Sequence, residues 1–251
     1  MSETMELEDY LAAGGKLSTP LNAPPRYRGE LMRLMASFVD SELAGSAGFA
    51  DVINEAPGIK SRIAAARIVL EKADHAERVL EIMGEFGADT ARYAVHQPWS
   101  ARLDRHADLG QVRRGGDMRL SVFHYPLEGW TDAVVFNVLM GLATGVQLDE
   151  LCRISFAPLA EIFRDIAPRE KRHTELGIEG LELLATQSGE PEKIRASAAY
   201  WMPRVEATFG LAASKRFDIQ KKFGLRHMPN EDLAGVWKQQ AGAELQKIGI
   251  T

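Results

Sequence analysis

The sequence predicts an all-α fold, a bundle of long helices with a long crossover between the second and third and extra helices at its C-terminal end. Apolar residues recur at three-to-four spacing through several long segments, which is the periodicity of helices with one buried face. No segment alternates convincingly as a strand would. The 251 residues, 45% of them hydrophobic, suffice for a sizeable core.

The composition narrows the class of protein. A formal net charge of -5 argues against nucleic acid as the main partner. The single cysteine, Cys152, excludes an internal disulfide and fits a reducing cytoplasm, where we expect the protein to work. Residues 1–10 are acidic, unlike a secretion signal. The longest apolar run, 133–146, is too short to span a bilayer, so we expect a buried helix and no membrane partner.

Residues 1–26 are expected to form a partly ordered lead-in, and 27–251 a single helical domain. The lead-in contains glycines and prolines that interrupt regular structure: Gly14, Gly15, Pro20, Pro24 and Pro25. A first helix is predicted from Tyr27 to the Asn-Glu-Ala-Pro-Gly break at 54–58. A second is predicted over 61–84, with Gly87 as its stop signal.

The connection over 93–129 is rich in Arg, Asp and Gly. A connection of that length in a compact domain is usually functional or carries short structure of its own. The third helix, about 130–154, is apolar on nearly every side and should lie at the centre of the bundle. The fourth covers about 158–184, and Pro168 should kink it or mark its true start. Further helices are expected within 192–209 and 230–248.

Four polar residues occupy positions that helical periodicity assigns to apolar faces: Glu42, His75, Glu170 and His173. Glu170 and His173 form a Glu-x-x-His pair, whose spacing puts carboxylate and imidazole on one helical face. A buried carboxylate is costly unless something positive meets it. Several such groups facing inward from different helices suggest a metal site.

Di-iron carboxylate bundles take one Glu from each of two helices and a Glu-x-x-His from each of the other two. Here that pattern is incomplete. Lys72 stands where the second helix should supply a Glu, and Glu71 lies about 100° around that helix. The third helix has Gly141 near the depth where a carboxylate is wanted, and acids only toward its ends.

Further short passages extend this pattern over about residues 27–249. They are Tyr27-Arg28, 41–45 (Ser-Glu-Leu-Ala-Gly), Ala56-Pro57, 123–126 (Phe-His-Tyr-Pro) followed by 130–132 (Trp-Thr-Asp), 151–156 (Leu-Cys-Arg-Ile-Ser-Phe), Trp201, Pro203 and Phe209-Gly210. With these passages the chain resembles the ferritin-like phenylacetic acid catabolic family, in particular the catalytic (A) subunits of phenylacetyl-CoA 1,2-epoxidases. The resemblance implies a ferritin-like four-helix bundle.

The resemblance also implies six metal ligands, of which Glu42, His75, Glu170 and His173 match four. Lys72 and Gly141 replace the other two, both carboxylates in the family. Two carboxylates and an ammonium group cannot neutralise two divalent ions in a dry interior. We therefore expect one iron or none rather than two. A two-metal site would need substitute ligands from Asp74, Asn137 or water, and without metal Lys72 would pair with Glu42 or Glu170.

Two functions follow from this comparison. The first is an epoxidase- or monooxygenase-like subunit with a degenerate, mononuclear iron site, an oxidoreductase if iron binds. The alternative is a metal-free, non-catalytic paralogue that serves as a structural or partner subunit. Metal-independent or radical chemistry in the same pocket is a third interpretation. We take Lys72 as the candidate catalytic residue and Glu42, His75, Glu170 and His173 as candidate metal ligands.

The resemblance implies partners as well. An aryl-CoA thioester or an aromatic acid is the expected ligand, electrons would come from a separate reductase, and a second helical subunit would brace the chain. The sequence does not identify the substrate-binding residues. Three arginines of the connection are candidates for CoA phosphates, although a solvated basic loop is the more common explanation of such residues: Arg113, Arg114 and Arg119. The apolar faces exceed what one bundle core needs, so we expect a homo- or hetero-oligomer.

Overall fold

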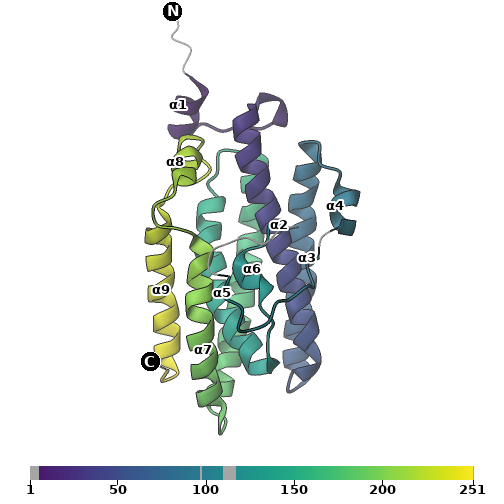
Figure 1. Cartoon of the computed structure of the whole chain (residues 1–251), viewed down its shortest axis with the longest axis vertical. Coiled ribbons are helices and arrows are strands. Elements are labelled where there is room, and N and C mark those ends of the chain that lie inside the picture. The colour runs from purple at the N-terminus through teal and green to yellow at the C-terminus, as the bar shows by residue number, and fades with distance from the viewer. Residues whose placement is uncertain (1–5, 97, 110–116, 251) are drawn as a thin grey trace, which may run out of the picture.

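A computed structural model describes residues 6–96, 98–109 and 117–250 and confirms the all-α prediction (Figure 1). Within these ranges no strand forms, and Leu17 and Phe156 make an isolated bridge. Short 3-10 segments join some of the elements, including Ser121–His124. The α-helices are α1 (Leu7–Ala12), α2 (Pro25–Val52), α3 (Ile59–Glu85), α4 (Thr90–His96), α5 (Gly129–Leu151), α6 (Ala157–Ala185), α7 (Glu190–Glu206), α8 (Lys215–Lys222) and α9 (Asn230–Lys247).

The bundle consists of α2, α3, α5 and α6. α2 packs along α3, α5 along α6, and α3 against α6. The chain crosses from α3 to α5 through a long connection that carries α4 and runs across the bundle (Figure 1). α7 and α9 pack outside α5, as expected for the extra C-terminal helices. The predicted four-helix bundle with a crossover is therefore confirmed.

The long helices lie close to their predicted ranges, and the short ones were missed. α4 overlaps the start of the segment treated as a connection. α1 and α8 were not predicted either, because six to eight residues carry too little periodicity. The suggestion that Pro168 marks the start of α6 is wrong. α6 begins at Ala157, with Pro158 in its first turn, where a missing backbone N–H costs nothing.

α5 is the central helix, and its residues Val135, Val138 and Leu139 are fully buried. By length and composition α5 could cross a membrane, with a mean hydropathy of 1.3 over its most apolar window. However, 67% of that window is buried inside the bundle, which confirms the predicted buried helix.

α5 and α6 approach each other closely at two glycines. A Cβ added at Gly141 would lie 2.4 Å from Thr174 Oγ1, and one added at Gly177 would lie 2.5 Å from Asn137 Nδ2. Real Cβ atoms do not come this close to other heavy atoms. The absence of a side chain at Gly141 thus allows tight packing against the stretch of α6 that contains Glu170 and His173.

The crossover connection is fastened to α2 by the buried carboxylate of Asp40. Its Oδ1 accepts hydrogen bonds of 2.8 Å from the Tyr93 hydroxyl and the Trp99 indole, and its Oδ2 accepts one of 2.6 Å from the backbone of Met118. Burial raises the pKa of Asp40 even though these bonds oppose the shift. Asp40 therefore holds the connection beside the part of α2 that carries Glu42.

Candidate functional site

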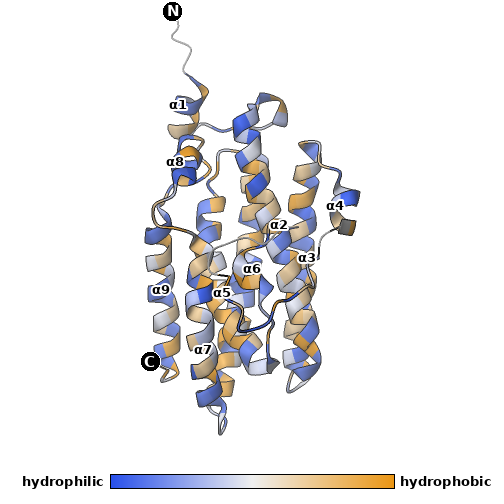
Figure 2. Ribbon diagram, viewed as in Figure 1, coloured by the Kyte–Doolittle hydropathy of each residue, from blue (hydrophilic) through white to orange (hydrophobic). Residues whose placement is uncertain are grey.

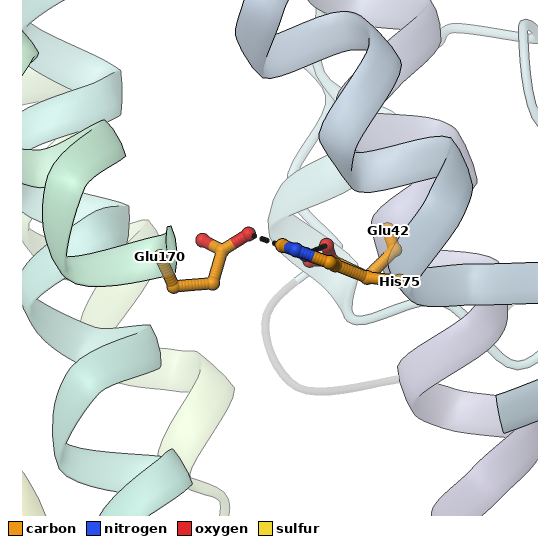
Figure 3. A group of neighbouring side chains, drawn as sticks. All are labelled: Glu42, His75 and Glu170. Carbon is orange, nitrogen blue, oxygen red and sulfur yellow. Dashed lines mark hydrogen bonds and ion pairs between the residues drawn. The ribbon is translucent and has the colours of Figure 1, made fainter. Parts of the chain in front are cut away.

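The interior of the bundle brings together five residues, which we call the Lys72 cluster: Glu42 from α2, Lys72 and His75 from α3, and Glu170 and His173 from α6. All are at most 7% exposed, and His75 is fully buried. Figure 3 shows Glu170 pointing across the gap from its helix toward His75 and Glu42. The structure thus unites every residue that the sequence nominated for the site.

The Lys72 ammonium group lies between the two carboxylates. Lys72 Nζ is 3.1 Å from Glu42 Oε1, 3.0 Å from Glu170 Oε1 and 3.1 Å from Glu170 Oε2. Burial alone would lower the pKa of Lys72, but the carboxylates of Glu170 and Glu42 outweigh it and raise that pKa. Lys72 is therefore a cation at neutral pH, and it holds two of the candidate metal ligands.

His75 contacts the same two carboxylates through one ring nitrogen. His75 Nδ1 is 3.2 Å from Glu42 Oε2 and 3.1 Å from Glu170 Oε1. Its Nε2 is buried with no hydrogen-bond partner among the described residues. Burial would lower the pKa of His75, and the hydrogen bonds to Glu170 and Glu42 raise it. Conversely, burial would raise the pKa of Glu170, but Lys72, His173 and His75 hold it well below its usual value.

His173 links the cluster to the edge of the α3–α6 interface. His173 Nδ1 lies 3.2 Å from Glu170 Oε1, and its Nε2 lies 2.6 Å from Glu71 Oε2. The sequence assigned Glu71 to another face of its helix and so outside the site. Its side chain is 27% exposed and still reaches His173. Helical angle alone could not reveal this, because it ignores the length of a glutamate side chain and the position of the neighbouring helix.

The substitute ligands considered for a second metal are occupied elsewhere. Asp74 is exposed and pairs with Arg169 at 2.6 Å on the surface. Asn137 donates its amide to the backbone carbonyl of His173 at 2.9 Å. Asp74 therefore offers no carboxylate to the cluster, and a carboxylate introduced at Gly141 would first need Thr174 to move.

The residues present do not fit a two-metal centre. Glu42, His75 and Glu170 each offer one ligand atom, and these atoms lie within 4.8 Å of one another. That group suits a single ion by ligand type. However, Lys72 Nζ sits 3.0–3.1 Å from the same carboxylate groups. An ion bound there must displace an ammonium group that is already paired with its ligands.

A cavity of about 290 Å³ reaches Glu42 from the side of α5, α8 and α9. Apolar side chains line part of it, including Phe38, Phe123 and Met140. Arg33, Arg216 and Arg226 also line it and supply positive charge. Periodicity did not predict this cavity, because its walls come from several separate parts of the chain.

Arg119, one of the three arginines proposed for CoA phosphates, does not line that cavity. Arg113 and Arg114 lie outside the described residues. Arg119 is 1% exposed, pairs with Asp117 at 2.6 Å, and donates to backbone carbonyls of the connection. The expectation for Arg119 as a solvated or phosphate-binding side chain is wrong: it holds the connection together from inside.

A four-helix bundle with carboxylate and imidazole groups facing its interior defines a ferritin-like helical protein. Within that class, the chain belongs to the phenylacetic acid catabolic protein family, whose model matches residues 12–251. It is 26% identical over 182 residues to the (A) subunit of the 1,2-phenylacetyl-CoA epoxidase of Escherichia coli (strain K12). The match covers 72% of this chain and 54% of that relative, so it spans about half of the relative's length.

Proposed function

We propose that this chain is a metal-independent helical subunit in phenylacetic acid catabolism, a paralogue of the epoxidase subunit rather than an iron oxygenase. The observation that carries the proposal is the position of Lys72 Nζ, 3.0–3.1 Å from oxygens of both Glu42 and Glu170. A cation fixed by the chain itself occupies the place that a metal would need. The cluster would then stabilise the bundle and not activate oxygen.

The charges support this proposal. The Glu42 and Glu170 carboxylates carry two negative charges, and Lys72 with a protonated His75 balances them. The raised pKa of His75, which opposes the effect of its burial, fits that protonation. A divalent ion added to this neutral set would leave two uncompensated positive charges in a low-dielectric interior unless Lys72 or His75 moved away or lost its proton.

A single-iron oxidoreductase is the second candidate. It is favoured by one observation, the ligand atoms of Glu42, His75 and Glu170 within 4.8 Å of one another. In that case Lys72 would swing away from both carboxylates. It would act as a catalytic residue only in that displaced position. Bound iron would supply redox chemistry, and Glu42, His75, Glu170 and His173 would hold it.

The ligand and the partners are proposed from the relative. That protein is a phenylacetyl-CoA epoxidase subunit, so we infer an aryl-CoA or an aromatic acid as ligand of the cavity beside Glu42. The aromatic side chains Phe38 and Phe123 suit a ring, and Arg33 and Arg226 suit an anionic group. A second helical subunit would be a partner in the cytoplasm, and a reductase would be needed only if iron binds.

Iron content distinguishes the two candidates. The purified chain is loaded anaerobically with ferrous iron, desalted, and analysed by mass spectrometry for metal. The proposal predicts near zero iron per chain. About one iron per chain, lost in Glu170→Ala, would establish the single-iron site and overturn the proposal.

A restored variant is the matched positive control. Lys72→Glu with Gly141→Asp returns both missing carboxylates, and Thr174→Ala makes room because Thr174 Oγ1 lies 2.4 Å from a Cβ at position 141. Iron binding by this triple variant, and not by the wild type, would attribute the loss of metal to those positions. An iron-free triple variant with an intact helical spectrum would contradict the assignment of these residues as ligand positions.

A further inference from the structure

The outer face of α3 is apolar along its N-terminal half. Ile59 is 79% exposed, Ile63 57% and Leu70 70%, and Ala66 between them is also exposed. The spacing of four, three and four residues puts all of them on one side of the helix. Figure 2 shows hydrophobic colouring among hydrophilic patches at the lower end of the α2–α3 pair, where this segment begins. The inward face of α3 carries Lys72 and His75. The exposed apolar residues lie on the other face of the helix, so they do not contribute to the bundle core.

α6, which packs beside α3, also exposes an apolar side chain. Glu71, Asp74 and Arg78 of α3 contact residues 173, 169 and 165 of α6, so the two helices run antiparallel. That register brings Leu183, near the end of α6, to the level of the first turns of α3. Leu183 is 68% exposed. Scattered exposed apolar residues are normal, but a contiguous group of them marks an interaction surface.

The charges beside this surface are separated along α3. Its N-terminal half exposes the basic residues Lys60, Arg62 and Arg67. Its C-terminal half exposes the acidic residues Glu77, Glu81 and Glu85. Within the described part of the chain no salt bridge neutralises Lys60, Arg67, Glu77 or Glu81. The outer face of α3 is therefore basic and apolar at one end and acidic at the other.

We propose that this surface, the α3 face (Ile59, Ile63, Ala66, Leu70 and the flanking charges), binds the α3 face of a second copy of this chain. In a two-fold, antiparallel arrangement each basic half meets the acidic half of the other copy. The apolar residues nearest the axis, Ala66 and Leu70, pack against each other across it. A two-fold interface uses the same patch on both subunits, so self-complementarity of this kind is what it requires.

Other occupants fit the charge pattern less well. An anionic membrane surface would be repelled by the acidic half of the face. A parallel arrangement of two copies would oppose like charges along the whole length, which is destabilising. A different helical protein would need a separate complementary pattern, and binding of such a protein is one outcome of the charge-exchange experiment. The proposal is independent of whether the Lys72 cluster binds metal, because the α3 face points away from that cluster.

The first experiment measures the oligomeric state of the full chain by sedimentation equilibrium over a range of concentrations. We expect a dimer for the wild type and at least a tenfold higher dissociation constant for Leu70→Glu. Leu70 is an exposed side chain, so the variant should keep its helical spectrum. Leu21→Glu is the matched control, because Leu21 is 86% exposed and lies outside the α3 face, and it should dimerise as the wild type does.

A charge exchange tests the antiparallel arrangement. With the axis near Ala66 and Leu70, Lys60 lies opposite Glu77 of the second copy. Lys60→Glu and Glu77→Lys should each weaken the dimer several-fold, and the double variant should recover because every cross-pair regains opposite signs. A monomeric wild type at 100 µM, a dimer insensitive to Leu70→Glu, or a double variant no better than either single one would overturn the proposal. So would a monomer that binds a different subunit through Leu70.

Discussion

Two buried carboxylate clusters in the described part of this bundle differ in how completely their polar atoms are hydrogen-bonded. The first is the Lys72 cluster between α2, α3 and α6. The second, the Asp132 cluster, joins the start of α5 to α7 and the crossover and consists of Asp132, Arg105, Ser197 and Trp201. Both bury acids among cations, but of the two only the first lies beside a cavity and has a ring nitrogen that no described residue meets.

Every oxygen lone pair of Asp132 has a donor. Its Oδ1 accepts from Arg105, Ser197 and Trp201 at 2.6–2.9 Å, and its Oδ2 accepts from Arg105 and the backbone of Glu128 at 2.9–3.0 Å. Burial would raise the pKa of Asp132, but these bonds lower it. A fully satisfied network of this kind rigidifies a fold and specifies one arrangement.

The Lys72 cluster pairs each of its charged groups but leaves one buried polar atom without a partner in the described part of the chain. Lys72 and His75 both approach the same two carboxylates, while His75 Nε2 has no partner among the described residues. A buried polar atom without a partner is costly in a purely structural core. The difference teaches that buried charge alone does not distinguish a candidate site from a structural cluster, and that an unpartnered buried atom in a cluster that reaches a cavity is the more selective sign.

Removing the ammonium group should have the largest effect. Lys72→Met leaves two buried carboxylates without their main cation, so we expect a loss of about 3–5 kcal/mol in the free energy of unfolding at pH 7. Urea denaturation followed by circular dichroism measures it. The loss should shrink when Glu170→Gln is added, since one uncompensated charge is removed. A loss below about 1 kcal/mol would show that Lys72 does not neutralise the carboxylates.

Asp132→Asn should cost less. It keeps the shape of the side chain and removes the charge that meets Arg105, so we expect a loss of about 2 kcal/mol. Divalent cobalt should stabilise neither this variant nor the wild type, and thermal melting with and without cobalt provides the comparison. A cobalt-dependent rise in the melting temperature of the wild type would mean that the Lys72 cluster accepts metal despite its ammonium group.

The pH dependence of stability should distinguish the clusters further. The folded pKa of His75 is raised, so its contribution is present below its unfolded pKa of about 6.5 and disappears as pH rises through the folded value. Glu170 has a lowered pKa, so its contribution disappears as pH falls below about 4.3. We expect maximal stability between these limits. The alkaline decline in the free energy of unfolding should be about 1.4 kcal/mol for each pH unit by which the folded pKa of His75 exceeds its unfolded pKa.

The variant His75→Gln is the control for that profile. This variant should remove the decline in the free energy of unfolding at high pH and leave the loss at low pH in place. Urea denaturation at a series of acidic and alkaline pH values measures both. An alkaline decline that persists unchanged in His75→Gln would mean that another group controls it.

The smallest effect is expected at the surface ion pair of Asp74 and Arg169. Both side chains are nearly half exposed, so Asp74→Ala should change the free energy of unfolding by no more than about 0.5 kcal/mol. Its metal content should equal that of the wild type. A change in either quantity would restore Asp74 as a member of the cluster.

Helical periodicity predicted most of the fold and the composition of the cluster. Glu42, His75, Glu170 and His173 stood out as polar residues on apolar faces, and all four are buried where their helices meet. Comparison with the ligand pattern of di-iron carboxylate bundles added Lys72 and Gly141 as departures from it. The long helices were predicted within a few residues, because each has enough turns to carry a clear period.

What periodicity could not predict depends on contacts between distant segments. Glu71 reaches His173 through its side-chain length, and Arg119 is buried by loop contacts, neither of which has a sequence period. The hydrogen bonds that Asp40 accepts from the crossover connection also join distant parts of the chain, so periodicity could not predict them. The cavity beside Glu42 likewise exists only once α2, α5 and α9 are packed.

The most direct test of the central claim is anomalous diffraction from crystals of the wild type grown with cobalt, recorded at the cobalt absorption edge. If Lys72 replaces the metal, there will be no anomalous peak within reach of Glu42, His75 and Glu170, and density for Lys72 Nζ will lie between the two carboxylates. A peak ligated by His75 Nδ1 and both carboxylates, with Lys72 turned aside, would contradict the claim.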